Sequence, residues 1–512
     1  MKKFLSILVI FTLIFTSAAP MTFAKNQFQA YEEGNLIEYM TYLVYECGQS
    51  FRGTPNEKKA ADYCYDVLAG FGYETEMYFP SLGNGNAVAI FEMSEGPDIL
   101  GNASPNSAAV EGANGKLIDL GTYGDDWAFS VPEGTEGNIV GAVRFTAAPT
   151  AAMINAIVAA ATEDESVTLT GLMTTNISTA TTMYGAPASL TGTDVPCLGV
   201  AYSNMCRALQ LPDYGLTKYL DGTPAPGNYV LSSSRATYTN TYTVVAKKPP
   251  TSGQTDLIIV FSGHFDTVLN SPGCNDDKSA IATILEMGRR FKDVDTGNVE
   301  LWFCPAGSEE GNGYAGAAYV ANTLLVGEEK AKAIDLNADM IAPGLNATYR
   351  GQKLDAISMD YSNTNQNNLV LNLPAYLVVD KAADIDWNTD VTNVTNVRIY
   401  GYGSSSHTPF HNAGIDAASM IFVQDSADDI EDGLSGYHTG NDTMSIDYSI
   451  ERHVLTTKLM ENAVWRAIND KVTKVAKFDV VVKGDNADVT LTNAGDIFNT
   501  WYQVDARFTG KD

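Results

Sequence analysis

The stretch LIIVFSGHFDT, residues 257–267, predicts how the second half of the chain folds. Leu257–Phe261 is a β-rich apolar run, and the polar residues after it mark the end of a strand. Another β-rich run, Tyr242–Ala246, precedes it across a Pro-Pro turn, and Val299–Cys304 is a further strand. The patterns of Ser279–Phe291 and, later in the chain, Ile450–Ile468 are helical. Strands that alternate with helices predict an α/β fold with a largely parallel sheet.

In such a sheet, ligands bind just outside the carboxyl ends of the strands, so the residues that follow the strands are candidate site residues. Segments with metal-binding or proton-transferring side chains are SGHFDT (262–267), PGCNDDKSA (272–280), GSEEG (307–311), LNADM (336–340) and YHTGNDT (437–443). Each alone is a weak signal, because single histidines and acidic pairs are usually solvated. Together they predict one site that contains two histidines, two aspartates and a glutamate pair.

These residue types suit a metal site. In the His-x-Asp pair of His264 and Asp266, the imidazole can bind an ion while the carboxylate orients it. Asp276 precedes a predicted helix, where its carboxylate could bridge two cations. The adjacent glutamates 309 and 310 are expected to diverge, which suits metal binding by one and proton transfer by the other.

In this order the five segments resemble family twenty-eight of the metallopeptidases, the secreted co-catalytic zinc aminopeptidases. The resemblance covers residues 240–468 and residues 35–80, where SFRGTPNEKKAADYCYDVLAGFGYE (50–74) is similar to the family's opening helices. It implies a phosphorylase/hydrolase-like zinc exopeptidase fold, with a mixed sheet flanked by helices. Residues 84–240 resemble more loosely the β-rich protease-associated domain that some members carry.

The resemblance also implies a role for each candidate residue. It implies five metal ligands: His264 and Asp339 on one zinc ion, Glu310 and His438 on the other, and Asp276 between them. Glu309 is then the general acid/base, Asp266 orients His264, and Tyr437 helps to stabilise the oxyanion. Two zinc ions per chain would polarise the scissile carbonyl and lower the pKa of a shared water. A free substrate amine could bind one ion, so the expected substrates are peptides with a free N-terminus.

The sequence departs from the family pattern in three places. One is Cys274, which lies two residues before Asp276, where a disulfide to Cys304 would tether two site loops. SSH (405–407) stands where many members have Ser-Asp-His, so one carboxylate is absent there. Lys278 stands where a small or neutral residue is usual, and it would alter metal affinity if it pointed inward. His407 and His411 are candidates for lining the site, whereas His453 is expected to be structural.

The N-terminus has the pattern of a signal peptide. Lys2 and Lys3 precede an apolar run that ends at Phe15, and a signal peptidase would cleave after Ala24. We therefore expect a protein that is secreted or held at the cell surface, with no stable membrane insertion after cleavage. The predicted division of the chain is a signal peptide (1–24), N-terminal helices of the peptidase domain (25–83), an inserted protease-associated-like domain (84–240), a zinc peptidase domain (241–470) and a β appendage (471–512).

Six cysteines in 512 residues exclude a dense disulfide framework. Proximity in the sequence favours the pairs 47/64, 197/206 and 274/304 among the fifteen possible connectivities. The chain has no CxxC motif, which argues against zinc held by thiolates.

The composition, with 45% apolar and 18% charged residues, is that of a soluble globular protein. A formal charge of −29 argues against nucleic-acid binding, because phosphate contacts need basic patches. The oligomeric state stays open.

Three other functions compete with the aminopeptidase. The related carboxypeptidase family twenty, which includes dipeptidases, also has motifs like GHFDTV and DDKSA, but its lid domain follows the Glu pair, whereas the insert here precedes His264. Glutaminyl cyclases work with one zinc ion and lack the first His ligand. A non-catalytic receptor-like protein of the same fold is the alternative from another class, although every ligand position here is occupied by a competent residue.

Overall fold

The structure is a computed structural model of the 512-residue chain. The residues that it describes are 33–102, 111–177, 192–209, 228–311, 313–345, 348–349, 352–353, 356–361, 367, 369–370, 373, 397–401, 404–423, 436–444, 447–469, 477–483 and 486–492. The predicted signal peptide lies outside them.

The central element is a mixed sheet whose middle strands are parallel. Its strands in spatial order are β1 (Glu74–Tyr78), β9 (Thr243–Lys248), β11 (Val299–Ala306), β10 (Leu257–His264), β12 (Ala333–Ala338), β17 (Asp416–Val423), β15 (Ala356–Tyr361) and β16 (Val397–Gly401). Strands β11, β10, β12 and β17 run parallel to one another, whereas β9 and β15 pair with them in the antiparallel sense. The predicted mixed α/β sheet is confirmed.

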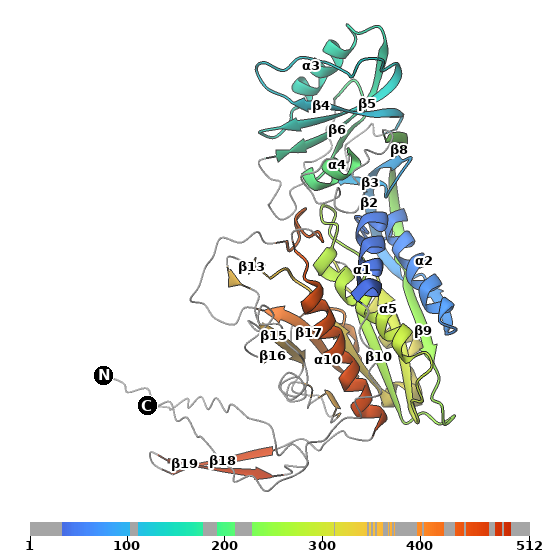
Figure 1. Cartoon of the computed structure of the whole chain (residues 1–512), viewed down its shortest axis with the longest axis vertical. Helices are drawn as coiled ribbons and strands as arrows, with labels where there is room; N and C mark the ends of the chain where they lie inside the picture. The colour runs from blue at the N-terminus through green and yellow to red at the C-terminus, as the bar shows by residue number, and fades with distance from the viewer. Residues whose placement is uncertain are drawn as a thin grey trace. The chain divides into compact units, whose positions relative to one another are not determined.

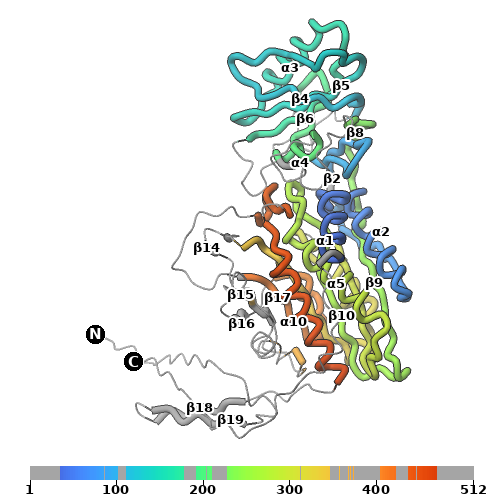
Figure 2. The backbone as a smooth tube through the Cα atoms, viewed as in Figure 1, coloured from blue at the N-terminus to red at the C-terminus, as the bar shows by residue number. Residues whose placement is uncertain are grey.

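Helices cover both faces of this sheet, because side chains along each strand alternate between the faces. In β10, Ile259 and Phe261 pack in one core with helices α1, α2, α5 and α10, while Ile258 and Val260 pack in another with α6 and η6. Although far apart in the sequence, α1, α5 and α10 lie against one another (Figures 1 and 2).

The helices begin where the sequence supplies caps. Helix α2 starts with Pro55 in its first turn, and the Thr54 hydroxyl accepts a hydrogen bond from the Glu57 N–H. The predicted spans Ser279–Phe291 and Ile450–Ile468 are those of α5 and α10. The other helical segments are α1 (Glu33–Thr41), η1 (Tyr42–Cys47), α2 (Pro55–Gly70), α3 (Ala151–Ala161), α4 (Tyr202–Ala208), η5 (Cys274–Lys278), α6 (Ala315–Tyr319), η6 (Val320–Leu324), α7 (Gly327–Lys332) and α9 (Thr408–Asn412).

A second sheet forms between β1 and β9 in the chain. Its strands in spatial order are β3 (Ile99–Asn102), β2 (Ser81–Met93), β8 (Tyr229–Asn240), β4 (Gly115–Thr122), β5 (Gly137–Phe145), β6 (Val167–Asn176) and β7 (Cys197–Gly199). It has its own apolar cores, one of them under α3 (Figure 1). That residues 84–240 are an independent domain of the protease-associated type stays a prediction.

Two smaller pairs of strands complete the described elements. They are β13 (Thr348–Tyr349) with β14 (Gln352–Lys353), and β18 (Lys477–Lys483) with β19 (Asn486–Thr492). The second pair lies within the predicted β appendage, residues 471–512. Within the described part of the chain, no helix is long and apolar enough to cross a membrane.

The predicted disulfides are wrong. Cys47, Cys64, Cys274 and Cys304 are buried thiols, which excludes the pairs 47/64 and 274/304. The Cys197 thiol donates a hydrogen bond to the Thr174 hydroxyl, at 3.7 Å, so the pair 197/206 is not formed either. Proximity in the sequence did not identify partners, because each cysteine fills a place in an apolar core, where a thiol packs like a small hydrophobic group.

Candidate metal centre

Three parallel strands bring most of the predicted ligands to one edge of the sheet. His264 is the last residue of β10, the glutamates 309 and 310 follow β11, and Asp339 follows β12. Strand β10 is longer than the predicted run Leu257–Phe261, because Ser262–His264 continues its pairing with β11. The carboxyl ends of adjacent parallel strands meet, and this places the four residues together.

Two loops add the remaining ligands. Asp276 lies in η5, just before α5, and His438 lies in the loop that leads to α10. The result is two groups of potential metal ligands, each with its ligand atoms within 4.8 Å of one another: His264, Asp276 and Asp339 in one, and Asp276, Glu310 and His438 in the other. The structure thus brings together all five predicted ligands.

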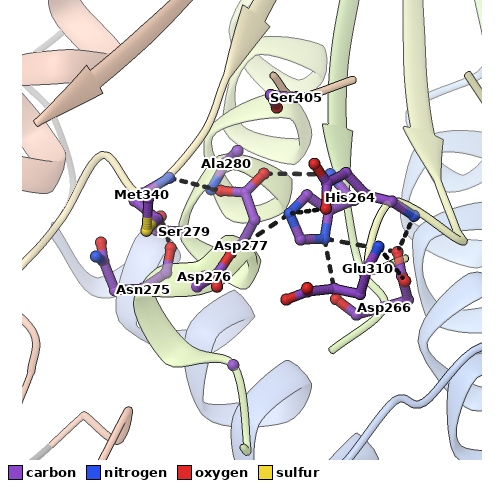
Figure 3. A network of polar contacts seen from close by, with 12 residues as sticks. His264, Asp266, Asn275, Asp276, Asp277, Ser279, Ala280, Glu310, Met340 and Ser405 are labelled. Atoms are coloured by element: carbon purple, nitrogen blue, oxygen red, sulfur yellow. Dashed lines mark hydrogen bonds and ion pairs between the residues drawn. The ribbon is translucent and has the colours of Figure 1, made fainter. Parts of the chain in front are cut away.

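Asp276 faces both histidines with different oxygens. Its Oδ1 lies 3.4 Å from His264 Nε2, and its Oδ2 lies 3.2 Å from His438 Nε2. His438 Nε2 is also 3.0 Å from Glu310 Oε2. A carboxylate with one oxygen in each group has the geometry needed to bridge two cations. Figure 3 shows Asp276 on the His264 side, together with Asp266 and Glu310.

Asp266 links His264 to the glutamate pair. The His264 ring Nδ1 lies 3.0 Å from the Asp266 main-chain oxygen and 3.5 Å from its carboxylate Oδ1. The two carboxylate oxygens accept the N–H groups of Glu309 and Glu310, at 2.9 and 3.1 Å. Asp266 therefore lies against the imidazole that it is predicted to orient, and it also holds the main chain of the glutamates, which the sequence did not indicate.

Two further aspartates hold the loops that carry the ligands. Asp277 accepts N–H groups from His264 and Met340, at 3.2 and 3.1 Å, and lies outside both ligand groups. Asp442, four residues after His438, accepts the N–H groups of Asn275 and Asp276, at 2.6 and 3.2 Å. The loop of one ligand is thus tied to the loop of another.

Ligand-bearing loops contain left-handed residues that are not glycine. Ser308 precedes the glutamate pair, Met340 follows Asp339, and His438 is itself a ligand candidate; their φ values are 65°, 49° and 56°. Each such residue costs about 1–3 kcal/mol, so the surrounding contacts must hold it in place. Strain of this kind concentrates at functional sites.

The charges of the site are costly without a cation. Burial raises the pKa of Glu310 to about 7 and that of Asp339 to about 6, and it raises the pKa of Glu309 well above its ordinary value. Burial lowers the pKa of His438, but its hydrogen bonds to Asp276 and Glu310 raise it overall to about 11. Glu310 Oε1 and Asp339 Oδ1 are buried without a hydrogen-bond partner among the described residues. Divalent cations would satisfy these oxygens and favour the ionised carboxylates.

This donor set fits zinc. Imidazole and carboxylate are ligands that zinc accepts in proteins, and each group offers three of them, which leaves a coordination position open as in catalytic sites. The six thiols lie outside both groups. The residues present therefore suit catalytic rather than purely structural zinc.

The other sequence candidates lie around the ligands. The Tyr437 ring stacks on His438, with centroids 3.8 Å apart. The Ser405 hydroxyl hydrogen bonds to the Asp339 carboxylate. Neither His407 nor His411 belongs to a ligand group.

Lys278 does not place its charge among the ligands. Its ammonium group is fully buried and donates hydrogen bonds to the main-chain oxygens of Gly48 and Pro272, the latter at 2.7 Å. His453 binds the Tyr448 hydroxyl and the Ser279 main-chain oxygen, at 2.9 Å each, as expected of a structural histidine.

Sequence reasoning missed the residues that support the site. Asp442 had a signal, since it lies in the same YHTGNDT segment as His438. Arg52 lies in SFRGTPNE, and its guanidinium donates to the Glu310 main-chain oxygen. The roles of both depend on contacts between segments that are far apart in the chain.

Comparisons with known proteins agree with this geometry. Residues 243–461, which include all five ligand candidates, match the model of peptidase family M28. Aminopeptidase YwaD of Bacillus subtilis (strain 168) is 28% identical over 246 residues, or 47% of this chain and 48% of that protein. The chain thus spans about half the length of this curated relative.

Solved structures are also similar to this chain. BSAP, a zinc aminopeptidase from Bacillus subtilis, superposes with a TM-score of 0.49 and 18% identity, over 85% of this chain and 95% of that one. The aminopeptidase from Aneurinibacillus sp. strain AM-1 has a TM-score of 0.44 and 21% identity, over 85% of this chain and 94% of that one.

Proposed function

We propose that this chain, whose residues 243–461 belong to peptidase family M28, is a secreted zinc-dependent aminopeptidase that removes N-terminal residues from peptides. The observation that carries the proposal is the pair of ligand groups that share Asp276, with Glu309 beside them. All five ligand candidates and Glu309 lie within the matched residues. His264, Glu310 and Asp339 lie at or just after strand ends, and Asp276 lies just before α5, which packs on the sheet.

The ligand residues would hold two zinc ions per chain. His264 and Asp339 would bind one ion, Glu310 and His438 the other, and Asp276 would contact both. When bound, the ions would polarise the scissile carbonyl and lower the pKa of a water molecule from 15.7 toward about 7.

Glu309 would move the proton. Its Oε2 lies 3.9 Å from His264 Nε2, beside the ligand groups rather than within them, and its main-chain N–H is held by Asp266. Burial favours the protonated carboxyl, so Glu309 can accept a proton from the attacking water and release it to the leaving amine. This is the role of a general acid/base.

Tyr437 and the substrate amine complete the proposal. The Tyr437 ring stacks on His438, which places it next to the ligands, where its hydroxyl could donate a hydrogen bond to the developing oxyanion. A free substrate amine next to one ion would position the first peptide bond for cleavage, which favours an aminopeptidase over a carboxypeptidase.

Secretion is part of the proposal and rests on the sequence alone. The basic and apolar pattern of residues 1–24 supports removal of a signal peptide. Sequencing of the mature N-terminus from culture medium would test it, and an intact Met1 on a protein that stays within the cells would contradict it.

One panel of substrates tests the activity. Purified protein should cleave aminoacyl chromogenic amides but neither N-blocked peptides nor peptides that report on C-terminal cleavage. A chelator should abolish the activity, zinc should restore it, and metal analysis should find about two zinc ions per chain. Cleavage only from the C-terminus would favour the carboxypeptidase, absence of zinc would favour the receptor-like protein, and full turnover by metal-free protein would refute the proposal.

A further inference from the structure

A short segment between η1 and α2 touches the loops that carry the ligands. This segment, residues 48–52, contacts three of them. The main-chain oxygens of Gly48 and Ser50 accept hydrogen bonds, from Lys278 Nζ and from the Thr267 N–H at 3.2 Å respectively. The side chains of Gln49 and Arg52 donate hydrogen bonds, from Nε2 to the Leu269 main-chain oxygen and from Nη1 to the Glu310 main-chain oxygen. The segment therefore supports the loops on which His264, Asp276 and Glu310 depend.

Gln49 connects this segment to the second sheet. Its side chain is 0% exposed. The amide oxygen accepts the Leu100 N–H at 3.2 Å, and the amide nitrogen donates to the Leu100 oxygen at 3.3 Å. Leu100 belongs to β3, the edge strand of the second sheet, so the amide occupies the hydrogen-bonding place of a further strand.

The same amide nitrogen donates to the Leu269 main-chain oxygen. Leu269 lies in the loop that follows His264 and Asp266 and leads to Asp276. One buried side chain thus joins the edge of the second sheet to the loop between two ligand candidates. Asn56 reinforces the connection, because its Nδ2 donates to the main-chain oxygens of Gln49 and Asp98, at 3.1 and 2.9 Å.

Removal of the Gln49 amide would affect both of its partners. An apolar side chain there would leave the N–H and oxygen of Leu100 and the oxygen of Leu269 without their hydrogen bonds in a buried place. The loop after His264 would then relax toward other arrangements. Because metal ligands must be held closely in position, a small relaxation lowers metal affinity.

We propose that Gln49 is a positioning residue of the metal centre, through which the sheet of β2–β8 helps to set the geometry of the ligand loops. The proposal rests on the proposed zinc peptidase function. It gives the second sheet a part in metal binding.

The test compares Gln49→Met and Gln49→Glu with Ser233→Ala in the full chain. Gln49→Met removes all three hydrogen bonds, and Gln49→Glu keeps the acceptor for the Leu100 N–H but loses both donors. The control, Ser233, lies in β8 and accepts the Ala113 N–H at 2.8 Å, a buried bond within the second sheet alone. Zinc affinity is measured by competition with a chromophoric chelator, and kcat and KM with an aminoacyl chromogenic amide.

Both Gln49 variants should bind zinc about 10- to 100-fold more weakly and lose a similar factor in kcat, while KM changes by less than about threefold. Ser233→Ala should keep zinc affinity and kcat within about twofold, even where its melting temperature falls. Folded Gln49 variants with the zinc affinity and kcat of the wild type would overturn the proposal. A wild-type chain that binds no zinc and cleaves no amide would instead refute the proposed function.

If neither Gln49 variant folds, hydrogen exchange of the wild-type chain tests the connection between β3 and the ligand loops instead. Zinc should slow exchange of the β3 amides, Ile99–Asn102, because it orders the loop to which Gln49 connects them. Exchange in β3 that does not respond to zinc, alongside slowed exchange at residues 264–276, would overturn the coupling.

Discussion

The two large sheets bury different kinds of polar side chain. In the described part of Ser81–Asn240 the polar residues that are buried as a whole are neutral: Thr135, Thr174, Thr175, Asn176, Asn204, Asn228 and Ser233. Arg207, whose guanidinium Nε and Nη1 are buried, is partly exposed as a residue. Around the sheet that contains β10 the buried polar residues include many charged groups, among them His264, Asp266, Asp276, Asp277, Asp339, His438 and Asp442. A buried charge is costly unless it is paired or binds a metal, so these charges indicate where the chemistry lies.

The comparison separates side chains that stabilise the fold from side chains that form the candidate metal site. The charged groups lie at the carboxyl ends of the parallel strands, and main-chain N–H groups hold several of their carboxylates. In the second sheet, by contrast, hydroxyls and amides satisfy main-chain groups of the same sheet, as Ser233 does for Ala113. Substitutions of the charged groups at these strand ends should therefore change catalysis and metal binding, whereas substitutions of the buried polar groups in the second sheet should change stability.

The largest effect is expected for Asp276→Ala. Asp276 belongs to both ligand groups, so its loss should weaken both zinc sites and reduce kcat/KM by about 10³-fold or more. Metal analysis beside kinetics checks this. Normal zinc content in the variant would mean that Asp276 does not bridge the ions, and Asp277→Ala is the matched comparison.

Glu309→Gln should have the next largest effect. The amide keeps the shape of the carboxylate but cannot accept the proton, so kcat should fall about 10²- to 10⁴-fold with both zinc ions still bound. Excess zinc should not restore the rate. Loss of zinc from this variant would show that Glu309 is a ligand.

Glu310→Gln tests the other member of the pair. Because Glu310 is 3.0 Å from His438 and belongs to one ligand group, its change should weaken one zinc site, with a loss of roughly 10- to 100-fold at limiting zinc. Excess zinc should recover part of this loss. If Glu310→Gln retained its zinc while Glu309→Gln lost it, the two roles would be exchanged.

The smallest effect, on stability alone, is expected for Asp335→Asn. Asp335 is fully buried on β12 opposite Val260 and Ala417, and burial raises its pKa well above the ordinary value. The raised pKa therefore adds to the free energy of unfolding below about pH 4. This added stability is lost as the pH rises through the pKa of the folded state. The variant should be more stable than the wild type by about 1–2 kcal/mol at pH 8 and by less at pH 5.

Urea unfolding at the two pH values measures this difference, with kcat as a control that should change by less than about twofold. An equal difference in the free energy of unfolding at pH 5 and pH 8 would mean that the Asp335 carboxyl is already ionised in the folded state at pH 5, which contradicts a raised pKa. The same pair of measurements on Ser233→Ala should show no dependence on pH, because the second sheet has no buried carboxylate at that position.

Local pattern was enough to predict the elements that carry the site. The apolar run at Leu257–Phe261 and the amphipathic spans of α5 and α10 were predicted because burial imposes their period along the chain. The ligand candidates were predicted as a set because five motifs occur in the order of a known family and carry side chains that suit zinc, and the fold brings them together. The disulfides were not, since spacing says nothing about which buried cysteines face each other.

The sequence by itself determined the α/β class and the span of the main elements, because these depend on residue type and local period, and its ordered motifs named the candidate metal ligands. Only the tertiary structure decided that Asp276 faces both histidines, that Asp442 and Asp266 hold the ligand loops, and that Gln49 joins the two sheets. Such contacts join residues up to 220 positions apart, and they form because buried main-chain groups must find hydrogen-bond partners wherever the fold brings them.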